Sequence, residues 1–187
     1  CPKMPKPVSM TIVDACSGAG GKALALADIL DGKGRVYGYD VFESKVAALK
    51  KRAKRSQLNN IQSVWVKEGD EEASLTKHMG SADLVLVDAP CSGWGVLKRN
   101  PDIKWRTNSA DLKRMPELQL RLLSLYSKIV KPNGKLVYGL CTFRKEETEQ
   151  VVEAFLNRNP GWEKIRGGYY GPGRTDGFFM QGFIRKT

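Results

Sequence analysis

Residues 10–30 read MTIVDACSGAGGKALALADIL, and this stretch decides the fold. A short apolar run ends in an acid, Asp14, a glycine-rich turn follows, and a segment rich in alanine and leucine, with the composition of a helix, comes next. A strand that leads through a turn into a helix is the unit from which parallel α/β sheets are built. The stretch therefore predicts the first strand, turn and helix of an α/β fold.

The same alternation of strand and helix patterns continues to the end of the chain. Strands are expected at residues 10–16, 35–40, 61–70, 82–90 and 135–141, with closing strands at 162–165 and 178–184. Helices are expected at 21–30, 43–58, 116–130 and 146–156, with Pro116 in the first turn of its helix and a turn at residues 132–134. The continuous apolar run at 82–90 predicts a strand buried on both faces. Together these segments predict a doubly wound, mostly parallel sheet of seven strands.

The size and charge of the chain bound its organisation and its partners. Its 187 residues suffice for one domain with a real core, so residues 1–187 are expected to form a single domain. The net charge is +11 at pH 7 and the isoelectric point is about 9.6, which favours an anionic partner. Nucleic acid is the usual partner of such a chain, and solubility alone is the alternative explanation of the charge.

Membrane, metal and secretory features are not expected from the sequence. No apolar run reaches the ~20 residues that span a bilayer, and the N-terminus lacks the apolar core of a signal peptide. The four cysteines, Cys1, Cys16, Cys91 and Cys141, form no C-x-x-C pair, so no metal site is predicted. Without a secretory context the cysteines are expected to stay reduced, which predicts a cytoplasmic protein.

Acidic residues follow the predicted strands with a regularity that indicates a ligand site. Asp14 ends the first strand, Asp40 ends the second and Asp88 ends the fourth. Asp70 follows the third strand, and Cys141 ends the fifth. In a parallel sheet these ends share one edge, where the ligands of doubly wound folds bind. Asp also caps helices and opens turns, but that role explains one or two of these residues rather than four.

The glycine-rich turn at residues 14–22, DACSGAGGK, is the candidate cofactor loop. Its glycines let the backbone approach a ligand closely, and Asp40 is placed to accept hydrogen bonds from a ribose diol. The spacing is neither that of a phosphate-binding P-loop nor G-x-G-x-x-G, and Asp14 would oppose the pyrophosphate of a dinucleotide. S-adenosylmethionine (SAM), with a cationic sulfonium and no phosphate, fits this charge better. Asp70, after the third strand, could approach the adenine amino group, but it lies among other acids, so an ordinary polar loop is an equally good explanation.

A second stretch, VLVDAPCSG at residues 85–93, places Asp88 and Cys91 three residues apart at the end of a strand. It is either a turn that contains an ordinary buried cysteine or part of a catalytic site. Cys141 lies at the end of another predicted strand. A catalytic thiol needs partial exposure and a lowered pKa, and the residues alone do not tell which of the two cysteines would be the nucleophile.

Four blocks of the sequence together resemble the RNA cytosine-5 methyltransferases of the Sun/Fmu group, and among them the bacterial ribosomal-RNA members. The blocks are DAPCSGWG (88–95), RNPDIKWR (99–106), LVYGLCTFRKEETE (136–149) and TDGFF (175–179). The resemblance extends from about residue 14 to residue 184. The chain departs from the family pattern at residues 17–19, where Ala-Ala-Pro is usual, and at Leu140, where Thr is usual. It also lacks the proline that commonly follows the second cysteine.

The resemblance implies a Rossmann-like SAM-dependent methyltransferase fold and the mechanism of an RNA cytosine-C5 methyltransferase. Cys141 would add to C6 of cytosine and so activate C5 toward the methyl group of SAM. Asp88 would stabilise the charge that builds near N3, and Lys22 would help to hold this acid. Cys91 would release the methylated base. The implied catalytic residues are therefore Cys141, Cys91, Asp88 and Lys22. The implied cofactor contacts are Cys16, Ser17, Gly18, Ala19, Gly20, Gly21, Lys22, Asp40, Asp70 and Asp88.

The partner that the resemblance implies is RNA, with ribosomal RNA as the expected class. Trp94 and Trp105 flank the first half of a basic block, and the basic residues are Lys98, Arg99, Lys104, Arg106, Lys113 and Arg114. Basic side chains suit phosphates and aromatic rings suit unstacked bases, although Trp105 is as readily a core residue. Family members usually carry an RNA-binding region before the catalytic domain, so the chain is expected to be a fragment that lacks it.

Two other functions remain open at this point. A DNA cytosine methyltransferase would use the cysteine of the pair Pro90–Cys91 as its nucleophile, and the PDIKW block together with Cys141 argues against it. The other is an RNA-binding module of the same fold that no longer catalyses. Substitution of each cysteine in turn separates the three functions, because only the leading one makes Cys141 the attacking group.

Overall fold

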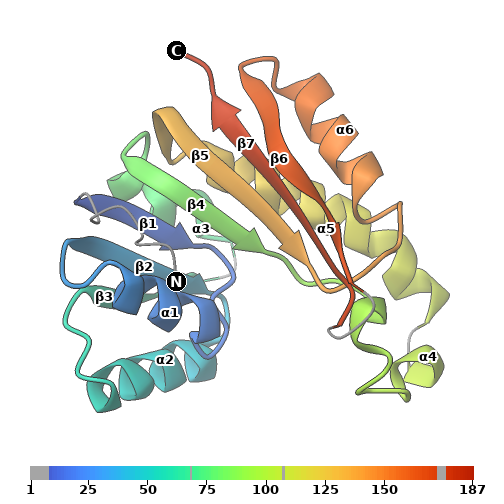
Figure 1. Ribbon diagram of the computed structural model, residues 1–187, viewed down its shortest axis with the longest axis horizontal. Coiled ribbons are helices and arrows are strands. Elements are labelled where there is room, and N and C mark those ends of the chain that lie inside the picture. Colours follow the sequence, from blue (N-terminus) through green and yellow to red (C-terminus); the bar gives the residue numbers. More distant parts are fainter. Residues whose placement is uncertain (1–8, 68, 107, 172–175) are drawn as a thin grey trace.

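A computed structural model describes residues 9–67, 69–106, 108–171 and 176–187 of the chain. These residues form one seven-stranded sheet flanked by helices (Figure 1). The strands lie in the order β3-β2-β1-β4-β5-β7-β6, and β7 runs antiparallel to both of its neighbours. Their bounds are β1 Met10–Asp14, β2 Gly34–Asp40, β3 Ile61–Trp65, β4 Ala82–Asp88, β5 Val130–Leu140, β6 Trp162–Tyr170 and β7 Phe178–Arg185. The predicted doubly wound, mostly parallel sheet is confirmed.

Helices cover both faces of the sheet (Figure 1). Helices α1 (Gly21–Ile29) and α2 (Glu43–Arg55) pack on one face, over β1 and β2. Helices α3 (Glu71–Leu75), α5 (Ser109–Ser127) and α6 (Glu149–Arg158) pack on the other. The short α4 (Ile103–Arg106) and two 3₁₀ turns, η1 (Thr76–His78) and η2 (Trp94–Val96), lie in the connections. The strand order reverses between β1 and β4, which is where folds of this class bind their ligands.

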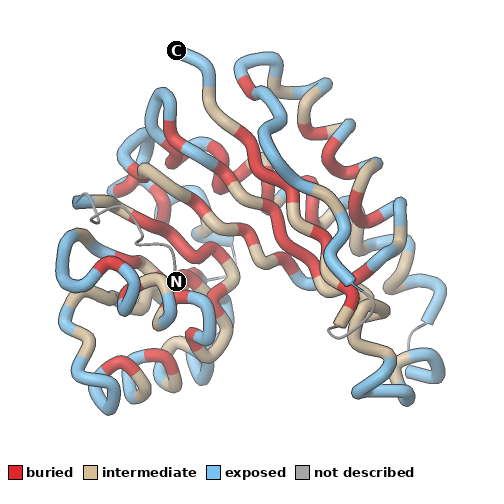
Figure 2. The backbone as a smooth tube through the Cα atoms, viewed as in Figure 1, coloured by how far each residue is buried: buried red, intermediate tan, exposed pale blue. Residues whose placement is uncertain are grey.

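Two apolar clusters form the core, one on each face of the sheet (Figure 2). The smaller joins α1 and Leu49 of α2 to β1 and β2. The larger joins β4, β5 and β7 to α5 and α6. On β4, Val85 and Val87 are fully buried in the larger cluster, whereas Leu84 and Leu86 on the opposite face are only partly buried. The predicted burial of β4 is therefore complete on one face only.

The predicted start of a helix at Pro116 is wrong, because α5 begins earlier and Pro116 lies inside it. The helix is capped by Asn108, whose side-chain oxygen accepts the backbone N–H of Asp111 at 2.7 Å. A proline inside a helix supplies no N–H to the carbonyl four residues earlier, here that of Leu112. That carbonyl accepts a hydrogen bond from Arg144 Nη1 at 3.5 Å instead. A side chain from beyond β5 thus compensates for the proline.

Other element boundaries also differ from the predicted ones. The turn expected at residues 132–134 lies within β5 as an irregularity, because the register of β5 against β4 shifts there. Strand β6 extends to Tyr170 and β3 ends at Trp65. Helix α6 begins at Glu149 rather than at residue 146. Glu147 therefore belongs to the turn that joins β5 to α6, and this turn can direct its side chain inward.

Gly34 provides a test of the register between β1 and β2. Its φ is +134°, and a Cβ at this position would lie 2.3 Å from the backbone oxygen of Met10. We expect Gly34→Ala to lower the free energy of unfolding by about 2 kcal/mol or more, because β1 cannot move aside without breaking its pairing. Urea unfolding measures the change. In the control, Gly161→Ala, the new Cβ meets no atom within 4 Å, and an equal loss there would contradict this explanation.

Candidate functional site

The carboxyl ends of β1, β4 and β5 meet at one edge of the sheet and bring the predicted site residues together (Figure 1). Asp14 ends β1, Asp88 ends β4, and Cys141 directly follows β5. The register pairs Asp14 with Leu86 and Asp88 with Gly139, so the three strand ends lie side by side. The glycine-rich turn after β1 opens at the same edge. This edge is the candidate active site.

Asp40 and two positive-φ glycines shape the predicted cofactor loop. Gly18 and Gly20 have φ of +54° and +87°, values that a residue with a side chain rarely adopts. The N–H of Gly18 donates to Asp40 Oδ2 at 2.8 Å, and the N–H of Phe42 donates to Asp40 Oδ1 at 3.0 Å. Each carboxylate oxygen keeps a second lone pair. Asp40 therefore holds the loop in place and can still accept a hydrogen bond from a ribose hydroxyl.

Asp14 is the most unusual group of the site. Only 1% of its surface is exposed, and neither carboxylate oxygen has a hydrogen-bond partner among the described residues. Burial raises the pKa of Asp14 to about 7, the carboxylate of Asp88 adds to the rise, and the charge of Lys22 opposes it. A buried carboxylate without donors is costly, and a cationic group of a ligand would relieve that cost. The site therefore favours a sulfonium or ammonium group over a pyrophosphate.

Asp88 and Lys22 form an ion pair across the site. Lys22 Nζ lies 2.5 Å from Asp88 Oδ2 and 5.9 Å from the centre of the Phe178 ring. Both side chains are partly exposed, so a ligand can reach the pair. The absence of a side chain at Gly139 leaves room for the Phe178 ring, because a Cβ there would lie 3.1 Å from Phe178 Cζ. The contact expected between Lys22 and the acid is thus present.

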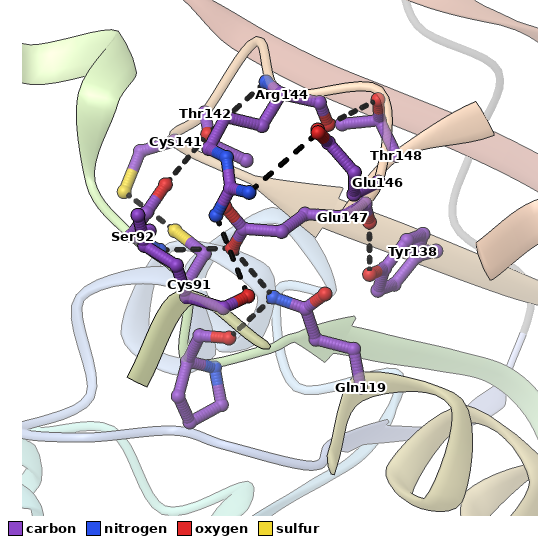
Figure 3. Close-up of polar contacts among 12 residues, drawn as sticks. Cys91, Ser92, Gln119, Tyr138, Cys141, Thr142, Arg144, Glu146, Glu147 and Thr148 are labelled. Atoms are coloured by element: carbon purple, nitrogen blue, oxygen red, sulfur yellow. Dashed lines mark hydrogen bonds and ion pairs between the residues drawn. The ribbon is translucent and has the colours of Figure 1, made fainter. Parts of the chain in front are cut away.

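Cys91 and Cys141 face each other with their sulfur atoms 3.2 Å apart (Figure 3). The hydrogen bond from Cys91 lowers the pKa of Cys141 to about 7, and Lys22 contributes to this change, while burial and Asp88 oppose it. The same hydrogen bond and burial raise the pKa of Cys91. These opposite shifts favour Cys141 over Cys91 as the sulfur that carries the negative charge. The environment separates two cysteines that the sequence alone leaves equivalent.

Further contacts join the turns that carry the two cysteines. The hydroxyls of Ser92 and Thr142 lie 2.9 Å apart, and the N–H of Gly95 donates to the carbonyl of Cys141 at 2.9 Å. A Cβ at Gly95 would lie 1.9 Å from the carbonyl oxygen of Gly177, so no side chain fits there. The turn after β4 and the turn after β5 therefore form one unit that holds both sulfur atoms.

Of the remaining predicted residues, Asp70 lies apart from this cluster, whereas Cys16 lies near the acids of the site. Asp70 is exposed at the N-terminus of α3, and in the described part of the chain it has no hydrogen bond or ion pair with the other site residues. Cys16 lies in the cofactor loop, where burial raises its pKa and makes it unreactive. Cys1 lies outside the described residues. Within the described ranges no group of three His, Cys, Asp or Glu residues could hold a metal ion, and no helix could span a membrane.

Helix α4, which carries Lys104, Trp105 and Arg106 of the basic block, lies beyond the carboxyl ends of β4 and β5 (Figure 1). Trp105 of α4 is 81% exposed, so it is not a core residue, and Lys104 Nζ lies 4.9 Å from the centre of its ring. Trp94 instead packs against Phe143, with ring centres 6.0 Å apart, and lies under the guanidinium of Arg144. Trp105 is therefore free to stack on an unpaired base, whereas Trp94 shapes the turn near the cysteines. A pocket of about 210 Å³ lies between α4, α5 and the turn after β4.

Three residues that shape the site were missed by the sequence analysis. Arg52 of α2 donates to the carbonyl of Ala19 in the cofactor loop at 2.7 Å, although it belongs to a run of basic residues with the pattern of an exposed face. Glu147 and Gln119 are both fully buried. Glu147 belongs to the acidic run EETE, which reads as solvent-exposed. The one signal for Gln119 is its place between two leucines of an amphipathic helix.

Comparisons with known proteins agree with this geometry. Residues 4–179 match the family described as 16S rRNA methyltransferase RsmB/F. The chain is 37% identical over 153 residues to the probable ribosomal RNA small subunit methyltransferase B of Bacillus subtilis (strain 168), and the match covers 82% of this chain and 34% of that relative. The chain thus spans about a third of the length of this curated relative.

Two solved structures show the same fold. The crystal structure of PH0851 superposes with a TM-score of 0.84 at 30% identity, covering 95% of this chain and 43% of that one. The structure of NSun6 from Pyrococcus horikoshii with SFG gives a TM-score of 0.79 at 23% identity, covering 95% of this chain and 48% of that one. The fold is therefore the Rossmann-like fold of SAM-dependent methyltransferases.

Asp14 makes the stability of the protein depend on pH. Its folded-state pKa of about 7 lies above the ordinary value of 3.8, so stability falls as the pH rises through this interval. We expect Asp14→Asn to raise the free energy of unfolding by about 2–4 kcal/mol at pH 8 and to change it little at pH 4, where the wild-type carboxyl is protonated. Urea unfolding at the two pH values measures this difference. Equal effects at both would show that the buried charge is not the cause.

Proposed function

The chain belongs to the RsmB/F family of 16S rRNA methyltransferases, and on that premise we propose that it methylates C5 of a cytosine in RNA, with ribosomal RNA as the substrate class. The observation that carries the proposal is the Cys91–Cys141 contact of 3.2 Å beside the Asp88–Lys22 ion pair. Methylation at C5 requires a thiolate for attack, an acid near the ring and a second group for release. The short distances among Cys91, Cys141, Asp88 and Lys22 support these roles.

SAM is the methyl donor that these residues fit. Asp14 offers a buried carboxylate without a donor, Asp40 borders the same loop, and Asp88 lies close enough to raise the pKa of Asp14. Carboxylates gathered around one loop favour a cationic ligand without phosphate. When bound, SAM supplies an electrophilic methyl group. The solved NSun6 structure that contains SFG, a SAM analogue, supports this choice. The loop residues 16–22 and Asp70 complete the proposed cofactor contacts.

Cys141 is the proposed nucleophile. Its thiolate adds to C6 of the target cytosine, and the electron pair of the C5=C6 bond then makes C5 nucleophilic. The lowered pKa of Cys141, about 7, supplies thiolate at neutral pH, whereas the pKa of Cys91 is raised. This difference disfavours the alternative in which Cys91, preceded by Pro90, attacks as in a DNA-type mechanism.

Asp88, Lys22 and Cys91 are proposed to act around the attacked ring. Asp88 is proposed to face N3 and to share a proton with it, so that N3 is protonated as the thiolate adds. Lys22, 2.5 Å from Asp88, then stabilises the Asp88 carboxylate that remains. After methyl transfer the Cys91 sulfur, as a thiolate, accepts the C5 proton and the C5=C6 bond re-forms. The electron pair of the C6–S bond then returns to the Cys141 sulfur, and the methylated base is free. Cys91, whose sulfur lies 3.2 Å from that of Cys141, is the group proposed to assist this release.

The surface beyond the cysteines is proposed to hold the RNA strand. Trp105 presents an exposed ring between Lys104 and Arg106, a combination that suits a stacked base and its flanking phosphates. The target cytosine must leave its stack to reach Cys141. The pocket of about 210 Å³ is lined by both Cys91 and Arg106, so it extends from α4 to one cysteine of the reactive pair.

We further infer that residues 1–187 are the methyltransferase domain of a longer cytoplasmic protein. The Bacillus subtilis relative extends well beyond the matched part, since the match covers 34% of its length. A small domain makes few contacts with RNA, and an additional RNA-binding region would provide further contacts for selecting one site. The net charge of +11 supports contact with RNA on the domain itself.

The two cysteines provide the test that separates the candidate functions. We expect Cys91→Ala to accumulate a covalent adduct between Cys141 and RNA in the presence of SAM, and Cys141→Ala to lose methyl transfer at least about 100-fold. Denaturing gels detect the adduct, and labelled SAM measures transfer. Full activity of Cys141→Ala would overturn the assignment of the nucleophile. A wild-type chain that binds RNA but transfers no methyl group would favour a binding module.

Trp105 tests the RNA-binding surface. We expect Trp105→Ala to weaken binding of single-stranded RNA about tenfold, because loss of one stacked base costs roughly 1–3 kcal/mol. Fluorescence anisotropy at constant salt measures the affinity. Trp65→Ala is the matched control, since Trp65 is also exposed but ends β3, which lies three strands from β4. Equal losses in both variants would argue against a base-stacking role for Trp105.

A further inference from the structure

We propose that Glu147 is a positioning residue that clamps the turn after β4 onto the turn after β5 and so holds the Cys91 sulfur within hydrogen-bond distance of the Cys141 sulfur. The catalytic consequence of this role rests on the proposed function. Within that function, Glu147 favours Cys141 over Cys91 as the attacking cysteine. Glu147 itself touches neither sulfur atom through any hydrogen bond of the described structure. It acts through the backbone and through its charge.

The carboxylate of Glu147 is fully buried, and each of its partners is a hydrogen-bond donor (Figure 3). Oε2 accepts the backbone N–H of Ser92 and Nε2 of Gln119, both at 2.9 Å. Oε1 lies 3.5 Å from Arg144 Nη1. The backbone carbonyl of the same residue accepts the hydroxyl of Tyr138 at 2.8 Å, which fixes the turn that carries the side chain. A buried carboxylate with such partners is satisfied as an anion.

These contacts converge on the backbone around Cys91. Ser92, whose N–H is bound, follows Cys91 directly, and Gln119 also donates to the carbonyl of Pro90, just before it, at 2.9 Å. The chain on both sides of Cys91 is thus tied, directly or through Gln119, to a carboxylate six residues after Cys141. The clamp spans the two turns, so it controls the distance between their sulfur atoms.

The charge of Glu147 also distinguishes the two thiols. Its negative charge adds to the hydrogen bond and the burial that raise the pKa of Cys91. On the other side of the pair, Lys22 lowers the pKa of Cys141 and Asp88 raises it. Glu147 therefore opposes ionisation of Cys91 and leaves this cysteine as the donor, which in turn stabilises the thiolate of Cys141.

Glu147→Gln and Glu146→Gln form a matched pair of variants. The first places an amide NH₂ among donors, so at least one of the contacts to Ser92, Gln119 and Arg144 must break. The second removes the same charge one residue away, from a carboxylate that is 52% exposed and lies 3.7 Å from Arg144 Nη2. A change in cysteine reactivity that occurs in Glu147→Gln but not in Glu146→Gln therefore comes from the buried clamp and not from the loss of a negative charge in general.

Alkylation by iodoacetamide, followed for each cysteine by mass spectrometry from about pH 6 to pH 10, tests the clamp without RNA or SAM. We expect Glu147→Gln to move the midpoint of Cys141 alkylation to higher pH. The ratio of the Cys141 rate to the Cys91 rate at pH 7 should fall at least about fivefold, because Cys141 loses its donor while Cys91 loses a neighbouring negative charge. Glu146→Gln should keep the wild-type profile.

Cys16 serves as an internal reporter of folding, because burial and the neighbouring acids Asp14, Asp40 and Asp88 raise its pKa in the folded protein and keep it slow to react. If Cys16 reacts as fast as the other two in Glu147→Gln, the variant has unfolded, and Gln119→Met then decides. That variant removes the donor shared by Glu147 and Pro90 but keeps the buried charge, and we expect a smaller shift in the same direction. An unchanged Cys141 profile in the folded variant overturns the proposal. If the Cys141 alkylation profile shifts in Glu147→Gln but the wild-type protein methylates no RNA, the result supports the clamp and contradicts the proposed function.

Discussion

The pairing of β4 with β5 is the constraint on which the site depends. Their parallel register places Asp88 beside Gly139, so the two strands end at the same level. Cys91 follows Asp88 by three residues and Cys141 follows Gly139 by two, which is why both thiols reach one point. A slip of one residue would turn the side chains at these strand ends to the other face of the sheet. The irregularity at residues 132–134 takes up the extra length of β5 before the paired segment that leads to the site.

The site contains two buried carboxylates, Glu147 and Asp14, that differ in their hydrogen bonding. Glu147 has hydrogen-bond donors around both of its oxygens. Neither oxygen of Asp14 makes a hydrogen bond in the described structure, although the backbone N–H of Ala23 lies near enough to lower its pKa. The first is therefore part of the protein's own architecture, and the second is complete only when a cationic ligand joins it. Proteins commonly accept such a cost in stability where binding requires it. This difference in hydrogen bonding places the cationic ligand beside Asp14 rather than beside Glu147, which the positions of the two acids in the sequence do not indicate.

The sequence predicts the sheet, its mostly parallel order and the strand ends that carry reactive groups, because apolar periodicity and glycine turns are local signals. The predictions that failed depend on distant contacts. Pro116 lies inside α5 because a residue from beyond β5 takes the carbonyl that the proline leaves free. Glu147 is hidden in an acidic run, and the turn before α6 directs it into the protein. Which cysteine carries the negative charge depends on their surroundings, and no spacing of residues contains that information.

The turn after β5 shows how the chain fixes the reactive pair without the residues that are usual in the family. Leu140, where Thr is usual, is fully buried and contributes packing, and Thr142 instead supplies the hydroxyl that contacts Ser92. A proline after the cysteine would stiffen the turn by restricting φ. Here the turn is held by the hydroxyl of Thr148, which donates to the carbonyl of Arg144 at 2.8 Å, and by the carboxylate of Glu147. The rigidity that a proline ring would give this turn comes instead from the buried Glu147 carboxylate, which also binds the turn after β4. In this chain the shape of the turn after β5 and the contact between the two sulfur atoms therefore both depend on Glu147.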